Sequence, residues 1–593
     1  MVNPDMLKNN LSADAVHNID KWLNEPKYQE YHDELVDMIE AERWQELEDA
    51  FFKVIEFGTG GRRGATGIGS NRINRVTIGE STQALCLYAE QANPGATEKG
   101  VVIACDTRLS SPELSQYAAS VAAANGFKTY LFDSFRATPE LSFAIRKLDC
   151  AVGIVISASH NPPVDNGFKA YWSDGAQLVS PHDIGVLKVA DEITDIHAVD
   201  FDQAVQEGTI EIIGESIDRA YVDAVVDQSE SSARDLRIAY SPLHGAGQTN
   251  VLPVLKAAGF KDVVLVQDQM TPDGNFPTVE NGKPNPEEKA ANDRAVALML
   301  AEDADIAVTN DPDADRFGIM VRQNDRAVYL TGNQSAVLAT DFALGKLAKK
   351  SSVTANHYIA KTIVTTEMMK AVADFYGATT YSNMLIGFKY IGELIRQKEL
   401  TDEVFVIGGE ESYGMLKGDY ARDKDGATGV LPLAEYAAEL KAEGKTLWDR
   451  LLELYKQHGL YVERLDTMVC PGAEGFQEMQ TIMQSLRDNP PTQIDDHKVT
   501  AIIDYASLTR TDLETGDTTP VDCANGNVFV LEFGDDRRRI TIRPSGTEPK
   551  LKFYNQWYQS TENPEQDYDD LMQDLENTSR ELEGTLLART NKK

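Results

Sequence analysis

The stretch AVGIVISASHNPPVDNGFKAYW, residues 151–172, decides how the chain folds. It opens with an apolar, β-branched run, Ala151–Ser157, that is typical of a buried strand, and it passes directly into a polar loop with two prolines. Three later segments have the same form: ADIAVTNDPDADR (304–316), EVFVIGGEESYG (403–414) and RRITIRPSGTEPK (538–550). Because ligands of open α/β sheets bind just beyond the carboxyl ends of strands, we expect the four loops to line one shared cleft.

The rest of the chain alternates short apolar runs with helical stretches. Runs such as Gly100–Cys105 indicate strands and stretches such as Pro112–Asn125 indicate helices, which predicts α/β units with largely parallel sheets. Residues 20–50 carry Trp, Tyr and Leu at helical spacing and predict amphipathic helices. At 593 residues the chain is too long for one hydrophobic core, so several domains are expected.

The composition limits the classes of partner. Hydrophobic residues make up 42% and charged residues 25% of the chain, as in ordinary globular proteins. The formal net charge of −37 argues against nucleic acid or an anionic membrane as a partner, because those surfaces attract positive charge. The five cysteines form no CxxC pair, and the N-terminus has no apolar signal segment. These features predict a reducing compartment and a cytoplasmic protein without a membrane span.

Asp311, Asp313 and Asp315 alternate in the sequence DPDADR. Three carboxylates this close repel one another unless a cation lies among them, and oxygen ligands suit Mg²⁺, Ca²⁺ or Mn²⁺. An EF-hand also begins DxDxD, but Arg316 stands where its glycine belongs and Arg322 where its glutamate belongs. A solvated acidic turn is the alternative, and the flanking apolar runs disfavour it. The sequence therefore predicts a metal site in this loop.

Three further segments carry groups suited to phosphate chemistry. Ser159 lies beside His160 in SASHNP, where the histidine could orient the serine or move a proton, although a stiff polar turn has the same form. RPSGTEPK combines Arg543 with hydroxyls and a glycine, which can bind a phosphate through parallel hydrogen bonds and backbone N–H groups; a hairpin turn is the alternative. GTGGRRG, residues 58–64, has the wrong spacing for a dinucleotide turn and suits an anion-binding loop.

Together these motifs resemble the α-D-phosphohexomutase family, and within it the longer members related to phosphopentomutases. The similarity runs from about Phe57 to Tyr554, and four separate motifs occur in the family's order. The resemblance implies a four-domain α/β architecture around a central cleft, with three related α/β domains that contain mixed sheets and a smaller α+β C-terminal domain. We expect these domains at residues 1–214, 215–326, 327–460 and 461–593.

The resemblance also implies roles for individual residues. It places a phosphoserine at Ser159 rather than Ser157, and it gives Mg²⁺ four ligands: Asp311, Asp313, Asp315 and that phosphoserine. The implied catalytic residues are Ser159, His160, Lys169, Arg63 and Lys424, the last in an RDKDG motif. The implied substrate-binding residues are Arg316, Lys389, Glu410, Ser412, Arg422, Arg543, Ser545, Gly546, Thr547 and Lys550. Arg62 stands where the family pattern FGTxGLRG has leucine, and no role is predicted for it.

The activity that the resemblance implies is an intramolecular phosphoryl transfer between the two ends of a hexose phosphate, with glucose phosphate as substrate. The phosphoserine gives its phosphoryl group to one sugar hydroxyl, the resulting glucose 1,6-bisphosphate turns over, and the enzyme takes back the other phosphoryl group. Mg²⁺ and glucose 1,6-bisphosphate are the expected cofactors, and the expected state is a monomer or a homodimer. Lys169, His160 and Lys424 are the candidates for general acid or base, and the sequence does not rank them.

Two groups of alternatives remain open on the same scaffold. Members that act on mannose phosphate usually read GEQSGH in the sugar loop, and GEESYG departs from this pattern, which favours glucose. A pentose phosphate is harder to exclude. A relative that only binds sugar phosphate would have lost the serine or an aspartate, whereas Ser159, Asp311, Asp313 and Asp315 are all present.

Overall fold

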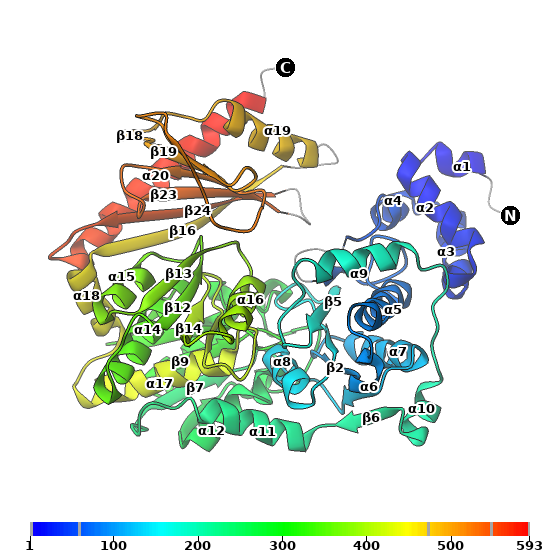
Figure 1. Cartoon of the computed structure of the whole chain (residues 1–593), viewed down its shortest axis with the longest axis horizontal. Helices are drawn as coiled ribbons and strands as arrows, with labels where there is room; N and C mark the ends of the chain where they lie inside the picture. The colour runs from blue at the N-terminus through cyan, green and yellow to red at the C-terminus, as the bar shows by residue number, and fades with distance from the viewer. Residues whose placement is uncertain (1–3, 57–60, 471–474, 546–549, 591–593) are drawn as a thin grey trace. The chain divides into compact units, whose positions relative to one another are not determined.

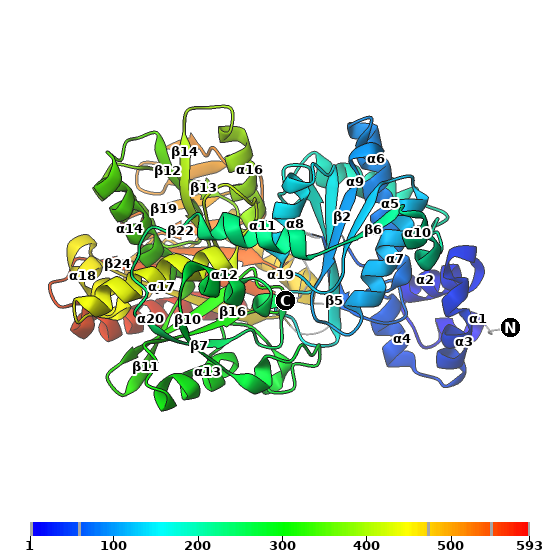
Figure 2. The same cartoon turned by 90° about the horizontal axis from the view of Figure 1, so that it is seen from below.

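The computed structural model describes residues 4–56, 61–470, 475–545 and 550–590, and two views of it are shown in Figures 1 and 2. These residues form two compact units. The first unit comprises residues up to Tyr329 together with Gly392–Thr401 and Gly414–Ala438. The second unit comprises Leu330–Ile391, Asp402–Tyr413 and the residues from Glu439 onward. Among the described residues, no helix is long and apolar enough to cross a membrane.

The chain begins with a small helical subdomain, residues 4–53, that we call the N-terminal cap (blue in Figure 1). Its elements are α1 (Pro4–Lys8), α2 (Ala13–Asn24), the 3₁₀ helix η1 (Pro26–Tyr31), α3 (His32–Glu40) and α4 (Trp44–Phe51). The Ser12 side chain accepts a hydrogen bond from the Ala15 backbone and so begins α2. Apolar residues at helical spacing, among them Leu35, Leu47 and Phe51, pack together in one buried cluster. The amphipathic helices predicted for residues 20–50 are confirmed.

The first sheet has the strand order β1-β5-β4-β2-β3-β6. Its strands are β1 (Gly61–Ala65), β2 (Val101–Cys105), β3 (Thr129–Phe132), β4 (Val152–Ile156), β5 (Asp165–Trp172) and β6 (Ile210–Ile213). The central strands are parallel, while β5 runs antiparallel to both β4 and β1. The associated helices are α5 (Arg75–Ala92), α6 (Ala96–Lys99), α7 (Ser111–Ala124), α8 (Thr138–Lys147), α9 (His182–Asp191), α10 (Phe201–Glu207) and α11 (Glu215–Val226).

The second sheet has the order β11-β10-β9-β7-β8. Its strands are β7 (Arg237–Ser241), β8 (Asp262–Leu265), β9 (Ile306–Asn310), β10 (Phe317–Gln323) and β11 (Arg326–Leu330), and its helices are α12 (Val251–Ala258) and α13 (Lys289–Ala301). Strand β9 is parallel to β7 and antiparallel to β10. The aspartate loop is therefore the connection between two buried, neighbouring strands of one sheet.

The second unit contains a parallel sheet in which β12 (His357–Thr362) pairs with β13 (Thr379–Met384) and with β14 (Val404–Gly409). Its helices are α14 (Gly332–Lys350), α15 (Met368–Tyr376) and α18 (Leu447–His458). Helices α16 (Phe388–Lys398) and α17 (Gly426–Ala442) contribute residues to both units, and the short strand β15 (Met415–Lys417) belongs to the first.

The C-terminal part of the second unit is built on an antiparallel sheet, in contrast to the parallel pairing before it. Its strands follow the order β16-β24-β23-β22-β19-β20-β21, and β16 (Leu460–Val469) pairs with β24 (Lys550–Gln559) along its whole length. The remaining elements are α19 (Gly475–Asp488), β17 (Gln493–Ile494), β18 (His497–Lys498), β19 (Ala501–Asp504), β20 (Thr509–Asp512), β21 (Thr518–Pro520), β22 (Phe529–Glu532), β23 (Arg539–Pro544) and α20 (Pro564–Thr590).

Candidate active site

The SASHNP loop connects β4 to β5 and holds Ser159 in an unusual conformation. Ser159 has a φ of 51°, in the left-handed region, and its side chain is buried. Its Oγ donates a hydrogen bond of 2.7 Å to Asp311 Oδ2 and lies 3.2 Å from His160 Nδ1. Its backbone N–H donates to Ser157 Oγ at 2.8 Å. Left-handed backbone costs a residue other than glycine about 1–3 kcal/mol, so the surrounding structure must hold this loop in place.

Arg108 holds this loop in place, and its role was not predicted from the sequence. It follows strand β2, is fully buried, and is paired with Asp106 through a 3.1 Å contact of its Nε. Its guanidinium donates at 2.6–2.9 Å to the carbonyl oxygens of Ser159, Asn161 and Pro162 in the SASHNP loop and of Asp165 at the start of β5. One buried cation thus fixes the backbone at the serine and on its C-terminal side.

The aspartate loop brings three buried carboxylates together, with one oxygen from each lying within 4.8 Å of the others. Burial raises the pKa of Asp311 well above its ordinary value, and the neighbouring Asp313 and Asp315 raise it further. Burial also opposes ionisation of Asp313, but the Lys169 ammonium outweighs it and lowers the pKa of Asp313 below its ordinary value. The cluster therefore depends on nearby cations to compensate its buried negative charge.

These carboxylates fit a hard divalent cation. Asp313 Oδ1 and Asp315 Oδ1 are buried and have no hydrogen-bond partner among the described residues, although an orphaned buried carboxylate oxygen is costly. The other oxygen of Asp313 accepts bonds from Lys169 and from Thr138 Oγ1. Oxygen-only donors of this kind are the ligands that Mg²⁺ prefers, so a magnesium ion would be held by Asp311, Asp313 and Asp315.

Two lysines from different parts of the chain reach the aspartates. Lys169 on β5 places its Nζ 2.5 Å from Asp313 Oδ2 and 3.5 Å from Asp315 Oδ2. Lys424 of the RDKDG loop places its Nζ 2.8 Å from Asp315 Oδ2. Gly414 is required here, because a Cβ at this position would lie only 2.4 Å from the side chain of Lys424. The last glycine of GEESYG therefore makes room for the lysine of RDKDG.

Two arginines lie near the same cluster. Arg63 on β1 donates to Asn161 Oδ1 at 3.4 Å, next to the serine loop. Burial lowers the pKa of the Arg63 guanidinium, and the nearby Arg316 cation lowers it further. Arg316 follows the aspartates and is paired with Glu287 at 2.8 Å. An anionic group bound near these two arginines would stabilise their neighbouring positive charges.

The other predicted binding residues are placed as follows. Arg422 is buried in the first unit, where its guanidinium bonds to Glu399 and to the Asp419 and Ala421 carbonyl oxygens, so its contact with substrate stays a prediction. Lys389, Glu410, Ser412, Arg543, Ser545 and Lys550 lie in the second unit. The Ser545 N–H donates to the Lys550 carbonyl oxygen at 2.8 Å and so closes the base of the RPSGTEPK loop. Gly546 and Thr547 lie outside the described residues.

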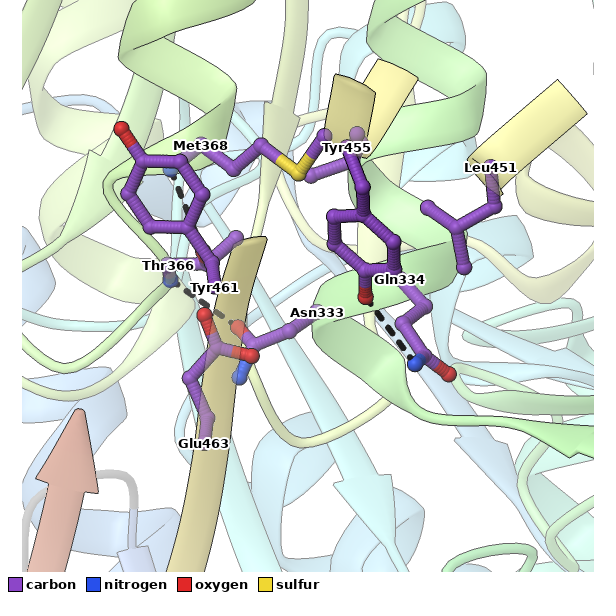
Figure 3. A pocket seen from close by; sticks show the side chains of 9 residues that line it. Asn333, Gln334, Thr366, Met368, Leu451, Tyr455, Tyr461 and Glu463 are labelled. Atoms are coloured by element: carbon purple, nitrogen blue, oxygen red, sulfur yellow. Dashed lines mark hydrogen bonds between the residues drawn. The ribbon is translucent and has the colours of Figure 1, made fainter. Parts of the chain in front are cut away.

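A small pocket in the second unit lies where β16 meets α14 and α18 (Figure 3). The space between its side chains hardly admits a water-sized sphere, whereas small-molecule sites have volumes of roughly 300–1,000 Å³. Its polar groups bond to one another: the Thr366 N–H donates to Asn333 Oδ1 at 3.0 Å, and Gln334 Nε2 donates to the Tyr455 hydroxyl at 3.2 Å. Burial raises the pKa of the lining residue Glu463 to about 7. We therefore do not place the substrate in this pocket.

Comparison with protein families agrees with the observed fold. Three profiles match in order: "Phosphoglucomutase/phosphomannomutase, alpha/beta/alpha domain I" over residues 54–197, its domain II over 219–324 and its domain III over 331–458. The chain belongs to the α-D-phosphohexomutase family and is a phosphohexomutase, an enzyme of the isomerase class. The predicted fold is confirmed: three α/β/α domains with mixed sheets precede a domain with an antiparallel sheet.

Comparison with individual proteins gives sequence identities and fold similarities. The chain is 35% identical to a phosphoglucomutase of Staphylococcus aureus over 512 residues, which span 86% of this chain and 90% of the relative. The fold resembles that of a phosphoglucomutase/phosphomannomutase family protein from Burkholderia thailandensis (TM-score 0.64, 19% identity, 90% of this chain and 98% of that one). It also resembles the open form of the parafusin phosphoglucomutase from Paramecium (TM-score 0.63, 18% identity, 86% and 92%).

Proposed function

We propose that this phosphohexomutase interconverts glucose 1-phosphate and glucose 6-phosphate through a phosphoserine on Ser159 and a glucose 1,6-bisphosphate intermediate. The observation that supports this most directly is the buried Ser159 hydroxyl, 2.7 Å from Asp311 in the carboxylate cluster. The 35% identical relative is a phosphoglucomutase, and the GEESYG loop departs from the pattern of mannose-specific members. Both favour glucose as the sugar.

The transfer is balanced by one proton. The bond between phosphorus and Ser159 Oγ breaks, a bond from phosphorus to a sugar hydroxyl forms, and the proton of that hydroxyl passes to the serine oxygen. His160 Nδ1 lies 3.2 Å from Ser159 Oγ, so we assign His160 to the proton at the serine end. The reverse transfer from the other end of the bisphosphate restores the phosphoserine.

The cations of the site stabilise the phosphoryl group while it is between two oxygens. Arg63 and Lys169 border the serine loop and the aspartate cluster, and we propose that both bind the transferring group. Lys424 is tied to Asp315 and is the proposed acid or base for the sugar hydroxyl. When bound by the three aspartates and the phosphoserine, Mg²⁺ supplies positive charge against the oxygens of the transferring group.

Residues of the second unit have the chemistry to bind the rest of the substrate. We propose that Glu410 and Ser412 bind sugar hydroxyls, because carboxylates and hydroxyls accept and donate the required hydrogen bonds. Arg543 and the rest of the RPSGTEPK loop would bind the phosphate that does not react. We also propose that the substrate contacts Lys389, Arg316 and Arg422.

The test combines labelling with a substrate panel. Phosphopeptide mapping of the purified protein should place the phosphoryl group on Ser159, and Ser159→Ala should abolish both label and turnover. Ser157→Ala is the matched control and should keep the label, because Ser157 Oγ bonds to the Ser159 backbone N–H and to Asp106, whereas Ser159 Oγ bonds to Asp311. Glucose 1-phosphate should exceed mannose 1-phosphate and ribose 1-phosphate in kcat/KM. Label on Ser157, or a better rate with either other sugar, would contradict the proposal.

A further inference from the structure

The N-terminal cap completes its core with residues that belong to the first α/β domain. Ile68 and Val76, which follow β1, are buried among the apolar residues of the cap. Hydrogen bonds link the same regions: the Asn71 N–H donates to the Ala50 carbonyl oxygen at 2.9 Å, and Ser70 Oγ donates to the Lys53 carbonyl oxygen at 2.7 Å. The family profile begins at residue 54, so the cap lies outside the matched domain and yet packs against the segment after β1.

Neighbouring arginines on β1 make different contacts, because side chains alternate along a strand. Arg63 donates to Asn161 in the serine loop. Arg62 is buried and donates from Nη1 to the Thr77 carbonyl oxygen at 3.1 Å and to Glu80 Oε2 at 3.4 Å, both on α5. The contacts that hold Arg62 therefore also fix the strand that carries Arg63.

The cap contributes the third member of this buried charge cluster. Lys27 in η1 places its Nζ 2.9 Å from Glu80 Oε1 and 3.3 Å from the Ile193 carbonyl oxygen. The side chains of Lys27, Arg62 and Glu80 are 10%, 7% and 13% exposed, so solvent screens their charges only weakly. Burial lowers the pKa of Lys27, but the Glu80 carboxylate outweighs it and the net shift is upward. One carboxylate thus compensates two buried cations.

We infer that the Lys27–Glu80–Arg62 cluster is a positioning device through which the N-terminal cap sets the orientation of Arg63 toward the serine loop. Glu80 and Arg62 are positioning residues, since neither touches the serine or the aspartates. The inference explains why an arginine stands at position 62, where the family pattern has leucine: a leucine could not use the carboxylate that Glu80 presents. It rests on the proposed function only in that Arg63 acts on the transferring phosphoryl group.

The test is a double-mutant cycle between Glu80 and Arg63, with kcat and KM measured for the full chain on glucose 1-phosphate. Because a misplacement of about 1 Å can cost ~100-fold in rate, and Gln keeps the shape of Glu but not its charge, Glu80→Gln should lower kcat about tenfold with little change in KM. In the Arg63→Met background, where no guanidinium is left to orient, Glu80→Gln should change kcat by less than about twofold. A purely structural role would give the same loss in both backgrounds.

Two further variants keep the test decisive. Arg62→Leu leaves the Lys27–Glu80 pair intact and should reproduce the non-additive loss if Glu80→Gln does not fold. Arg43→Met removes an exposed ion pair of the cap and should leave kcat within about twofold, since such pairs contribute little. A kcat close to wild type in both Glu80→Gln and Arg62→Leu, or additive losses, would overturn the inference. A wild-type chain without mutase activity would instead contradict the proposed function.

Discussion

Replacing Arg108 by methionine should disable the serine loop more than it disables the fold. Methionine has a similar length and is apolar, so it fills the space of the arginine stem without donating a hydrogen bond. Four carbonyl oxygens around Ser159 would lose their shared donor, and buried Asp106 would lose its ion-pair partner. The left-handed backbone at Ser159 would then be free to relax.

The magnitude follows from these contacts. Breaking a buried ion pair by removing one partner costs about 3–5 kcal/mol, and this sets the expected loss in the free energy of unfolding. The catalytic effect should be larger than stability alone explains, because a loop displacement of about 1 Å costs ~100-fold in rate. We therefore expect kcat to fall at least ~100-fold, with the phosphoserine occupancy at Ser159 reduced in parallel.

The matched control is Arg234→Met. Arg234 also donates to several carbonyl oxygens of its neighbourhood and pairs with Glu435 at 2.9 Å, but these contacts lie on a different part of the first unit. Thermal unfolding and kcat are measured for both variants at a temperature where both remain folded. Arg234→Met should lose stability and keep kcat. If Arg108→Met keeps kcat, or if both variants lose kcat equally, the loop is not held by Arg108 in the way its contacts indicate.

Three further outcomes follow from the site and its surroundings. Asp313→Asn should raise the Mg²⁺ concentration for half-maximal activity by about tenfold or more, and an unchanged titration curve would remove Asp313 from the metal site. Because the folded chain holds the Glu463 proton up to a pKa of about 7 and the unfolded chain releases it near 4.5, stability should fall as pH rises through this window. Glu463→Gln should remove that loss, which is at most about 3 kcal/mol, so a stability difference from wild type that stays constant with pH would contradict it. Arg543→Ala should raise KM for glucose 1-phosphate and glucose 6-phosphate by similar factors and increase release of glucose 1,6-bisphosphate; weakening of only one substrate would show that the loop serves one end.

Much of the fold follows from local sequence pattern. The apolar run Ala151–Ser157 forms β4 within a residue of its predicted bounds, and the run before DPDADR forms β9, because β-branched runs flanked by polar turns carry a strong local signal. The prediction of largely parallel pairing is correct for the central strands of the first sheet and wrong for the C-terminal sheet, whose pairing is antiparallel. The apolar run RRITI by itself has no feature that distinguishes parallel from antiparallel pairing.

The site was predicted only in part, since its supporting contacts join distant positions. Arg108 and Ser159 are 51 residues apart, and Lys27 and Glu80 are 53 apart, so no spacing in the sequence indicates that they meet. A signal for Arg108 did exist, because the polar sequence DTR follows the apolar run VVIAC just as the other site loops follow their strands. The bounds of the four domains and the shared cleft stay predictions.

The contact between Lys424 and Asp315 has a consequence for how the chain is made. Asp311, Asp313 and Asp315 leave the ribosome more than a hundred residues before Lys424, and domains generally fold from the N-terminus as they emerge. During that interval the buried carboxylates have Lys169 as a partner but lack the second ammonium. Until the segment Gly414–Ala438 has been synthesised, the first unit therefore lacks one of the cations that neutralise its buried carboxylates. The final packing of this unit is therefore a late step that depends on a contact between residues distant in the sequence. A chain released before this step would keep the aspartate cluster without the ammonium group of Lys424.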